Sequence, residues 1–193
     1  MFNQLIYLRE QAKLRGEPIL RDKSFELLKE TVTKKQPKRI LEIGVNLGLS
    51  GIAMLLCSEN AYLTGLEIDE EKVKLAKENY RTFGVEDRAK IFIGDAAEII
   101  PQLTAKYDFI FLDGPKGHYH QYLPYLLDVL DKGGILFADN VLFRGYVLGS
   151  VKTPHRYNTT KNAMLNFLQG IQQEGLKSTL YEMEDGVSIT EKL

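Results

Sequence analysis

The sequence predicts an α/β protein with a doubly wound, mostly parallel sheet and an antiparallel C-terminal hairpin. Short aliphatic and β-branched runs alternate with longer segments of helical period, which is typical of parallel strands covered by helices on both faces. The last two runs are separated by Asp185-Gly186, a strong signal for a hairpin turn. A parallel series of strands is therefore expected to end in an antiparallel pair.

The apolar runs set the expected order of the elements. Parallel strands are predicted at 39–45, 61–68, 89–95, 107–114 and 133–141, and the hairpin strands at 176–183 and 186–193. Helices are predicted at 49–58, 70–83, 96–103, 119–130 and 159–173. Two amphipathic segments, 2–15 and 23–34, precede the first strand and are expected to cap the sheet or the active site.

Length and charge narrow the class of protein. The 193 residues, 44% of them hydrophobic, suffice for one sizeable core and are too few for two ordinary domains. We therefore expect a single domain over 1–193, with an N-terminal helical cap at 1–36 and a catalytic core at 37–193. Because 25 Lys and Arg nearly balance 26 Asp and Glu, the net charge of -1 predicts no overall attraction to nucleic acid or membranes.

Targeting signals and cysteine chemistry are not indicated. The N-terminal segment lacks the charged lead and apolar run of a secretory signal, and no apolar stretch approaches the roughly 20 residues of a membrane span. We therefore expect a cytoplasmic protein. The single cysteine, Cys57, cannot form an internal disulfide and lies among apolar residues, which favours a small buried side chain over a catalytic one.

The first strand-to-helix turn, in EIGVNLGLSG, carries the first candidate ligand site. Gly44 and Gly48 allow a tight turn, and Ser50 at the helix start can donate to a ligand carboxylate. The GxGxxG spacing of dinucleotide sites is absent, and acidic Glu42 precedes the first glycine, which favours a cationic ligand over a pyrophosphate. Taken alone, the turn is equally consistent with a compact connection that binds nothing.

Carboxylates end the next two predicted strands as well. Glu67 can accept both hydroxyl hydrogens of a ribose, and Asp95 can accept from an adenine amino group. Each one singly is as consistent with a helix cap or a solvated position. Because the carboxyl ends of parallel strands share one edge of a sheet, the set together indicates an adenosine that carries a sulfonium and an amino acid.

Polar residues also end the predicted fourth and fifth strands, in FLDGPKG and FADNV. Asp113, Asp139 and Asn140 are therefore expected at neighbouring strand tips. Three hard oxygen ligands suit Mg²⁺, Mn²⁺ or Ca²⁺, and no cluster of Cys or His suggests zinc. Asp139-Asn140 alone is more typical of a polar strand end than of a metal site.

These motifs resemble a known family. LEIGVNLGLS, LEID and GDA resemble segments of class I S-adenosylmethionine (SAM)-dependent methyltransferases, and DGPK with DN resembles the metal and catalytic signature of the catechol and caffeoyl-CoA O-methyltransferases with their bacterial relatives. The resemblance runs from about Pro18 to the C-terminus and implies a seven-stranded Rossmann-like methyltransferase sheet. For SAM it implies Glu42, Gly44, Val45 and Ser50 around the methionine part, Glu67 at the ribose, and Asp95 and Ala96 at the adenine.

The resemblance also implies the catalytic residues. Asp113, Asp139 and Asn140 would bind a divalent metal, with Mg²⁺ ahead of Mn²⁺ and Ca²⁺. Asp113 would also lie close to the cofactor and count as catalytic, and Lys116 would act as general base. The N-terminal region is shorter than in longer family members, which leaves the acceptor and the formation of a homodimer open.

Several acceptors and one different class of function stay open at this point. A metal that binds two adjacent oxygens selects a small molecule with vicinal oxygens, such as a catechol. A 5-hydroxyuridine in tRNA offers a similar chelate, as in some bacterial family members, and basic residues that could track phosphates are Arg9, Lys13, Arg15, Arg21, Lys23, Arg144, Lys152, His155, Arg156 and Lys161. The different-class alternative is a SAM- or nucleotide-binding module without transfer activity, and a dinucleotide-dependent oxidoreductase is disfavoured by the glycine spacing.

Overall fold

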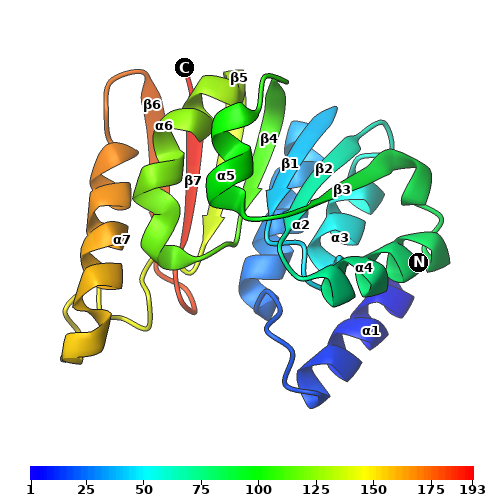
Figure 1. The fold of residues 1–193 in the computed structure, drawn as a ribbon, viewed down its shortest axis with the longest axis horizontal. Coiled ribbons are helices and arrows are strands. Elements are labelled where there is room, and N and C mark those ends of the chain that lie inside the picture. The colour runs from blue at the N-terminus through cyan, green and yellow to red at the C-terminus, as the bar shows by residue number, and fades with distance from the viewer. The chain divides into compact units, whose positions relative to one another are not determined.

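Three parallel strands form the sheet of the first of two units into which the chain divides, Met1–Asp95. The computed structural model describes residues 1–193. The strand order in this unit is β3-β2-β1, and Figure 1 shows the three strands side by side. The elements in chain order are α1 (Phe2–Leu14), α2 (Asp22–Lys35), β1 (Arg39–Ile43), α3 (Leu49–Cys57), β2 (Tyr62–Glu67), α4 (Glu70–Thr82), η1 (Glu86–Arg88) and β3 (Ala89–Ile93).

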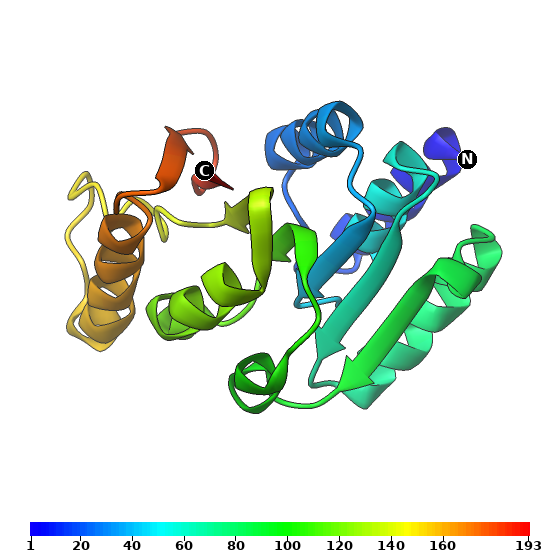
Figure 2. The same cartoon turned by 90° about the horizontal axis from the view of Figure 1, so that it is seen from above.

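Four strands form the sheet of the second unit, Ala96–Leu193, in the order β4-β5-β7-β6. β4 and β5 are parallel, whereas β7 pairs antiparallel with both β5 and β6. Helices α6 and α7 pack side by side (Figure 2). The elements are α5 (Ala96–Ile99), η2 (Ile100–Gln102), β4 (Tyr107–Leu112), η3 (Lys116–His118), α6 (Tyr119–Val129), β5 (Leu130–Asp139), η4 (His155–Tyr157), α7 (Asn158–Gly170), β6 (Leu176–Tyr181) and β7 (Val187–Lys192).

The fold class predicted from the sequence is confirmed. Three strands in one unit and four in the other give the seven strands of a mostly parallel sheet with an antiparallel C-terminal pair, flanked by helices. The two N-terminal helices are present as predicted, and both pack against α3. No helix in the structure has both the length and the apolar character needed to cross a bilayer.

Several predicted boundaries differ from the structure, and two of the differences have a clear local reason. β5 begins at Leu130 rather than at 133, because the strand includes an irregular stretch: Tyr107 pairs with Leu130, whereas Phe109 pairs with Ile135. The helix predicted at 96–103 is a short α-helix followed by a 3-10 turn that contains Pro101, which has no N–H for a continuing helical ladder.

The core explains why β4 reads as a continuous apolar run. Phe109, Ile110, Phe111 and Leu112 are all buried, as expected for a parallel strand covered on both faces. The Phe111 ring lies 5.7 Å from that of Phe137 on β5, measured between ring centroids. Burial of one such side chain stabilises the fold by about 1.5–3 kcal/mol, so this packing holds the ends of β4 and β5 in place.

Candidate functional site

The first strand-to-helix turn has the tight backbone that its glycines predict. Gly44 and Gly48 have φ angles of 89° and 75°, in the left-handed region that favours glycine. The Gly44 N–H donates to the Leu66 carbonyl at 3.0 Å, which ties the end of β1 to the end of β2. Ser50 is the second residue of α3 and is partly exposed, in the position expected for a donor at the helix start.

Asn46 stabilises this turn, a role that sequence reasoning missed. Its φ of 49° is left-handed, which asparagine tolerates better than most residues. Its side-chain Nδ2 donates to the Pro18 carbonyl at 2.6 Å, and its backbone N–H donates to Glu67 Oε2 at 2.8 Å. The asparagine within a glycine-rich turn was the available signal.

Glu67, the last residue of β2, organises the surrounding backbone. Besides Asn46, its carboxylate accepts from the N–H groups of Ile68 at 2.9 Å and Asp69 at 3.1 Å. A carboxylate has about four lone-pair directions, so these three bonds leave capacity for a ligand hydroxyl. Glu67 thus has a structural role, and its expected contact with the ribose stays a prediction.

Asp95 and Ala96 follow the end of β3. The Gly94 N–H donates to the Glu67 carbonyl at 2.9 Å, and Glu67 pairs in register with Ile93. Asp95 therefore follows β3 next to the end of β2, and it is partly exposed. Ala96 begins α5, the first element of the second unit.

Glu42 is fully buried near the end of β1. Its Oε2 lies 3.4 Å from the hydroxyl of Tyr80 on α4, a long hydrogen bond. Burial and then the charge of Glu42 raise the pKa of Tyr80 well above its usual value, so the phenol stays protonated as a donor. A Cβ on Gly51 would lie 2.3 Å from the Tyr80 hydroxyl oxygen and 2.8 Å from Glu42 Oε2. The glycine in the first turn of α3 therefore makes room for this pair.

Val45, in contrast, is a core residue. It is only 3% exposed, and a Cβ on Gly65 of β2 would lie 2.6 Å from its Cγ2. The Val45 side chain therefore packs against β2. Its expected contact with the methionine part of SAM stays a prediction.

In the second unit, the ends of β4 and β5 bring the predicted catalytic residues together. Leu112 on β4 pairs in register with Ala138 on β5. Asp113 and Asp139, the next residue in each chain segment, therefore lie at neighbouring positions. Asn140 has a φ of 57°, a left-handed conformation that ends the strand sharply. The expected neighbourhood of the two strand tips is confirmed.

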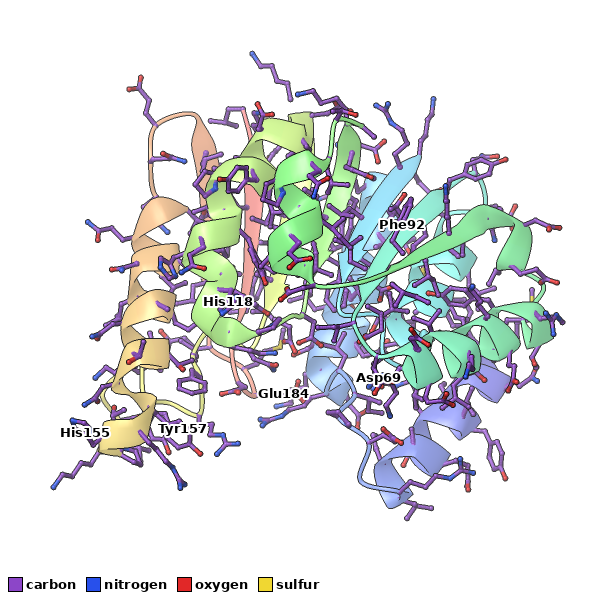
Figure 3. All side chains as sticks on the ribbon, viewed as in Figure 1. Asp69, Phe92, His118, His155, Tyr157 and Glu184 are labelled. Atoms are coloured by element: carbon purple, nitrogen blue, oxygen red, sulfur yellow. The ribbon has the colours of Figure 1, made fainter.

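Side-chain contacts link these residues in pairs. Lys116 Nζ donates to Asp113 Oδ1 at 2.8 Å, and each side chain is 23% exposed. Asn140 Nδ2 donates to Asp139 Oδ2 at 2.7 Å, while Asp139 itself is buried. His118, which follows Lys116 in η3, lies 3.3 Å from the Tyr122 hydroxyl through Nδ1, and Figure 3 shows it at the start of α6.

The donor set is compatible with a hard cation. Two carboxylates and one amide supply only oxygen ligands, the kind that Mg²⁺ and Ca²⁺ prefer. The Asn140 side chain donates its hydrogen bond to Asp139 through the amide nitrogen. A metal would be bound through the amide oxygen instead. No group of three or more His, Cys, Asp or Glu side chains is placed to hold a metal, so the expected metal stays a prediction.

The basic residues do not all belong to an exposed rim. Arg9 is only 3% exposed, donates to the Leu20 carbonyl at 2.7 Å and lies over the Phe25 ring, so its expected phosphate-tracking role was wrong. Burial lowers the Arg9 pKa, and Asp22 partly offsets this. The exposed basic residues between β5 and α7 are Arg144, Lys152, His155 and Arg156, and Figure 3 shows His155 near Tyr157 at the start of α7.

Comparison with known proteins decides the family. An O-methyltransferase family model matches residues 9–193. The chain belongs to this O-methyltransferase family. The methyltransferase is 30% identical to a catechol O-methyltransferase of Niastella koreensis over 161 residues, which cover 80% of this chain and 73% of that protein. It is also 30% identical to the catechol O-methyltransferase of Sus scrofa, over 83% of this chain and 91% of the relative.

Solved structures agree with this family. A candidate caffeoyl-CoA O-methyltransferase from Staphylococcus aureus matches with a TM-score of 0.87 and 28% identity, covering 98% of this chain and 92% of the other. The Podospora anserina methyltransferase PaMTH1, solved with S-adenosylhomocysteine bound, matches with a TM-score of 0.85 and 27% identity over 98% of this chain and 87% of the other. The protein is thus a SAM-dependent O-methyltransferase of the catechol and caffeoyl-CoA type.

Proposed function

We propose that this methyltransferase uses a divalent metal to transfer the methyl group of SAM to one hydroxyl of a vicinal dioxygen acceptor, such as a catechol. The observation that carries the proposal is the meeting of Asp113, Asp139 and Asn140 at the adjacent ends of β4 and β5, with Lys116 bonded to Asp113. Relatives named catechol O-methyltransferase support the acceptor class.

In this proposal the first unit supplies residues for SAM. Glu67 would bind the ribose and Asp95 the adenine, while Gly44, Ser50 and the buried charge of Glu42 would face the cationic amino-acid part. Support comes from the hydrogen bonds that join the ends of β1, β2 and β3 through Gly44 and Gly94, at 3.0 and 2.9 Å. These strand ends lie at the edge where open α/β sheets bind ligands.

The second unit would hold the metal and carry out the proton transfer. Asp113, Asp139 and Asn140 would hold the divalent metal, which would supply the Lewis-acid chemistry that lowers the pKa of an acceptor hydroxyl. Lys116 would accept the proton of the reacting hydroxyl at Nζ, and the Asp113 carboxylate, 2.8 Å away, would stabilise the ammonium that results. The acceptor oxygen then attacks the methyl carbon in line with its bond to sulfur.

An alternative candidate acceptor is 5-hydroxyuridine in tRNA. The observation that favours it is the set of exposed basic side chains after β5, of which two surround one aromatic ring. The guanidinium carbons of Arg144 and Arg156 lie 5.6 and 4.8 Å from the Tyr157 ring centroid. Exposed arginines next to an aromatic ring are suited to phosphates and stacked bases.

The experiment that tests the proposal follows the methyl group of tritiated SAM. Catechol, its monomethyl ether, and tRNA with or without 5-hydroxyuridine are offered in parallel with Mg²⁺. We expect label in catechol and little in the monomethyl ether, which cannot present two free hydroxyls. Label confined to the hydroxyuridine tRNA would replace the catechol acceptor by RNA, and equal labelling of both phenols would contradict the requirement for two adjacent free hydroxyls in a small-molecule acceptor.

A further inference from the structure

A fully buried tyrosine contacts the backbone of the two strand ends that precede the predicted catalytic residues. Tyr119 is the first residue of α6 and follows the 3-10 turn that begins with Lys116. Its hydroxyl oxygen lies 3.1 Å from the carbonyl oxygen of Leu112 and 3.2 Å from that of Asp139. These two carbonyls belong to the last residues of β4 and β5. One side chain thus contacts both strand ends.

The hydroxyl acts as a donor in both contacts. Backbone carbonyls only accept, so the single phenolic hydrogen is directed to one carbonyl or shared between the two.

The tyrosine ring is itself fixed by packing. It meets the Phe167 ring of α7 edge to face, with 5.4 Å between centroids, and Lys116 Nζ lies 5.9 Å from its centroid. The backbone of Tyr119 continues the turn that carries Lys116, so the position of this turn and the positions of the two strand ends are set by the same residue.

We propose that Tyr119 is a positioning residue that sets the spacing between Asp113 and Asp139, and so the affinity of the strand ends for a divalent cation. The inference rests on the metal site of the proposed function. Asp113 follows Leu112 directly, and Asp139 supplies its own carbonyl, so a shift of either strand end would move a predicted ligand. Outer residues that orient ligands typically change metal affinity by about 10- to 100-fold when they are replaced.

The test is Mn²⁺ binding to Tyr119→Phe, measured by titration calorimetry without acceptor. The substitution removes only the hydroxyl and keeps the ring against Phe167. We expect a Kd for Mn²⁺ about 10- to 100-fold higher than that of the wild type, with SAM affinity unchanged within about twofold. Tyr122→Phe is the matched control, because Tyr122 is a buried tyrosine on the same helix and its hydroxyl lies 3.3 Å from His118 Nδ1. Its Mn²⁺ affinity should equal that of the wild type.

A second variant separates positioning from general loosening. Phe167→Leu keeps the Tyr119 hydroxyl but removes the ring contact. It should lower the melting temperature while the Kd for Mn²⁺ stays close to that of the wild type. The inference is overturned if Tyr119→Phe binds Mn²⁺ like the wild type, or if Tyr122→Phe or Phe167→Leu loses as much affinity as Tyr119→Phe. Absence of Mn²⁺ binding by the wild-type protein would instead remove the metal from the proposed function, and the inference with it.

Discussion

In the first unit, the carboxylate of Glu67 hydrogen-bonds to the backbone around the strand ends. In the second unit, the hydroxyl of Tyr119 makes the contacts with the backbone. Glu67 accepts three backbone N–H groups, at 2.8, 2.9 and 3.1 Å. At the ends of β4 and β5, the Tyr119 hydroxyl holds the backbone, and the carboxylates of Asp113 and Asp139 contact the side chains of Lys116 and Asn140. Ligand binding and folding should therefore be coupled in the first unit and largely separable in the second.

The largest effect is expected for Lys116→Met in the second unit. Loss of a general base typically lowers the rate by about 10²- to 10⁴-fold, and kcat should fall in this range while SAM affinity stays the same. Steady-state kinetics with a catechol measures this. Lys132→Met, an exposed position on β5, is the control and should keep full activity. An unchanged kcat in Lys116→Met would exclude Lys116 as the base.

The next effect is that of Asp139→Asn, which keeps the shape of a buried side chain but removes its charge. Metal stabilisation of several kcal/mol corresponds to about 10²- to 10³-fold in rate, so metal-stimulated transfer should fall by this factor. The free energy of unfolding should change by less than about 1 kcal/mol. Normal turnover in this variant would contradict the metal assignment, and a large loss of stability would contradict the separation of folding from ligand binding.

Glu67→Gln tests the coupling expected in the first unit. Hydrogen bonds to a charged group contribute about 1.5–3 kcal/mol, so urea denaturation should show a loss of this order and calorimetry a SAM affinity lower by about tenfold. Glu59→Gln, at an exposed position, should change neither quantity. A loss of stability with normal SAM affinity would restrict Glu67 to organising the turn.

The sequence could predict the strands and the ends of strands because these depend on local apolar pattern. Asp113, Asp139 and Asn140 were expected at neighbouring tips from the strand order alone, and the register of Leu112 with Ala138 agrees. Tyr80 and Tyr119 could not be found in this way. Both occupy ordinary core positions of amphipathic helices, and the sequence pattern does not identify the partners of their hydroxyls on β1, β4 and β5.

The burial and the contacts of individual side chains also could not be predicted from the sequence. Arg9 has the same local pattern as an exposed basic residue, yet it donates to the Leu20 carbonyl and is buried. Gly51 did carry a signal, since glycine within a helix costs about 1 kcal/mol relative to alanine and indicates close packing. The signal did not identify the Tyr80–Glu42 pair that needs the space.

A smaller effect is expected from the contact between Gly51 and Tyr80. Gly51→Ala should destabilise the protein by about 1–3 kcal/mol through overpacking, and Tyr80→Phe by about 1 kcal/mol. Because the added Cβ would meet the Tyr80 hydroxyl oxygen at 2.3 Å, removal of that hydroxyl should relieve part of the strain. The double variant should therefore lose at least about 0.5 kcal/mol less than the sum, measured by urea denaturation. Strict additivity would show that the two positions do not interact.

The smallest effect is a decline of stability at alkaline pH. The pKa values of Tyr80 and Tyr119 lie well above the ordinary phenol value of 10.0 in the folded protein. Above that value the folded state binds more protons than the unfolded state, so stability is constant below it and falls as the pH rises further. The loss over the first pH unit is about 1 kcal/mol per tyrosine, and Tyr80→Phe should show a shallower decline. Equal slopes for the two proteins would contradict the burial of the phenol.

The most direct test of a metal-dependent methyltransferase is the transfer of tritium from labelled SAM to catechol in the wild-type protein, before and after removal of divalent ions with EDTA. We predict that transfer stops in EDTA and returns when excess Mg²⁺ is added, while SAM binding persists throughout. Transfer at an undiminished rate in EDTA would contradict the role proposed for Asp113, Asp139 and Asn140.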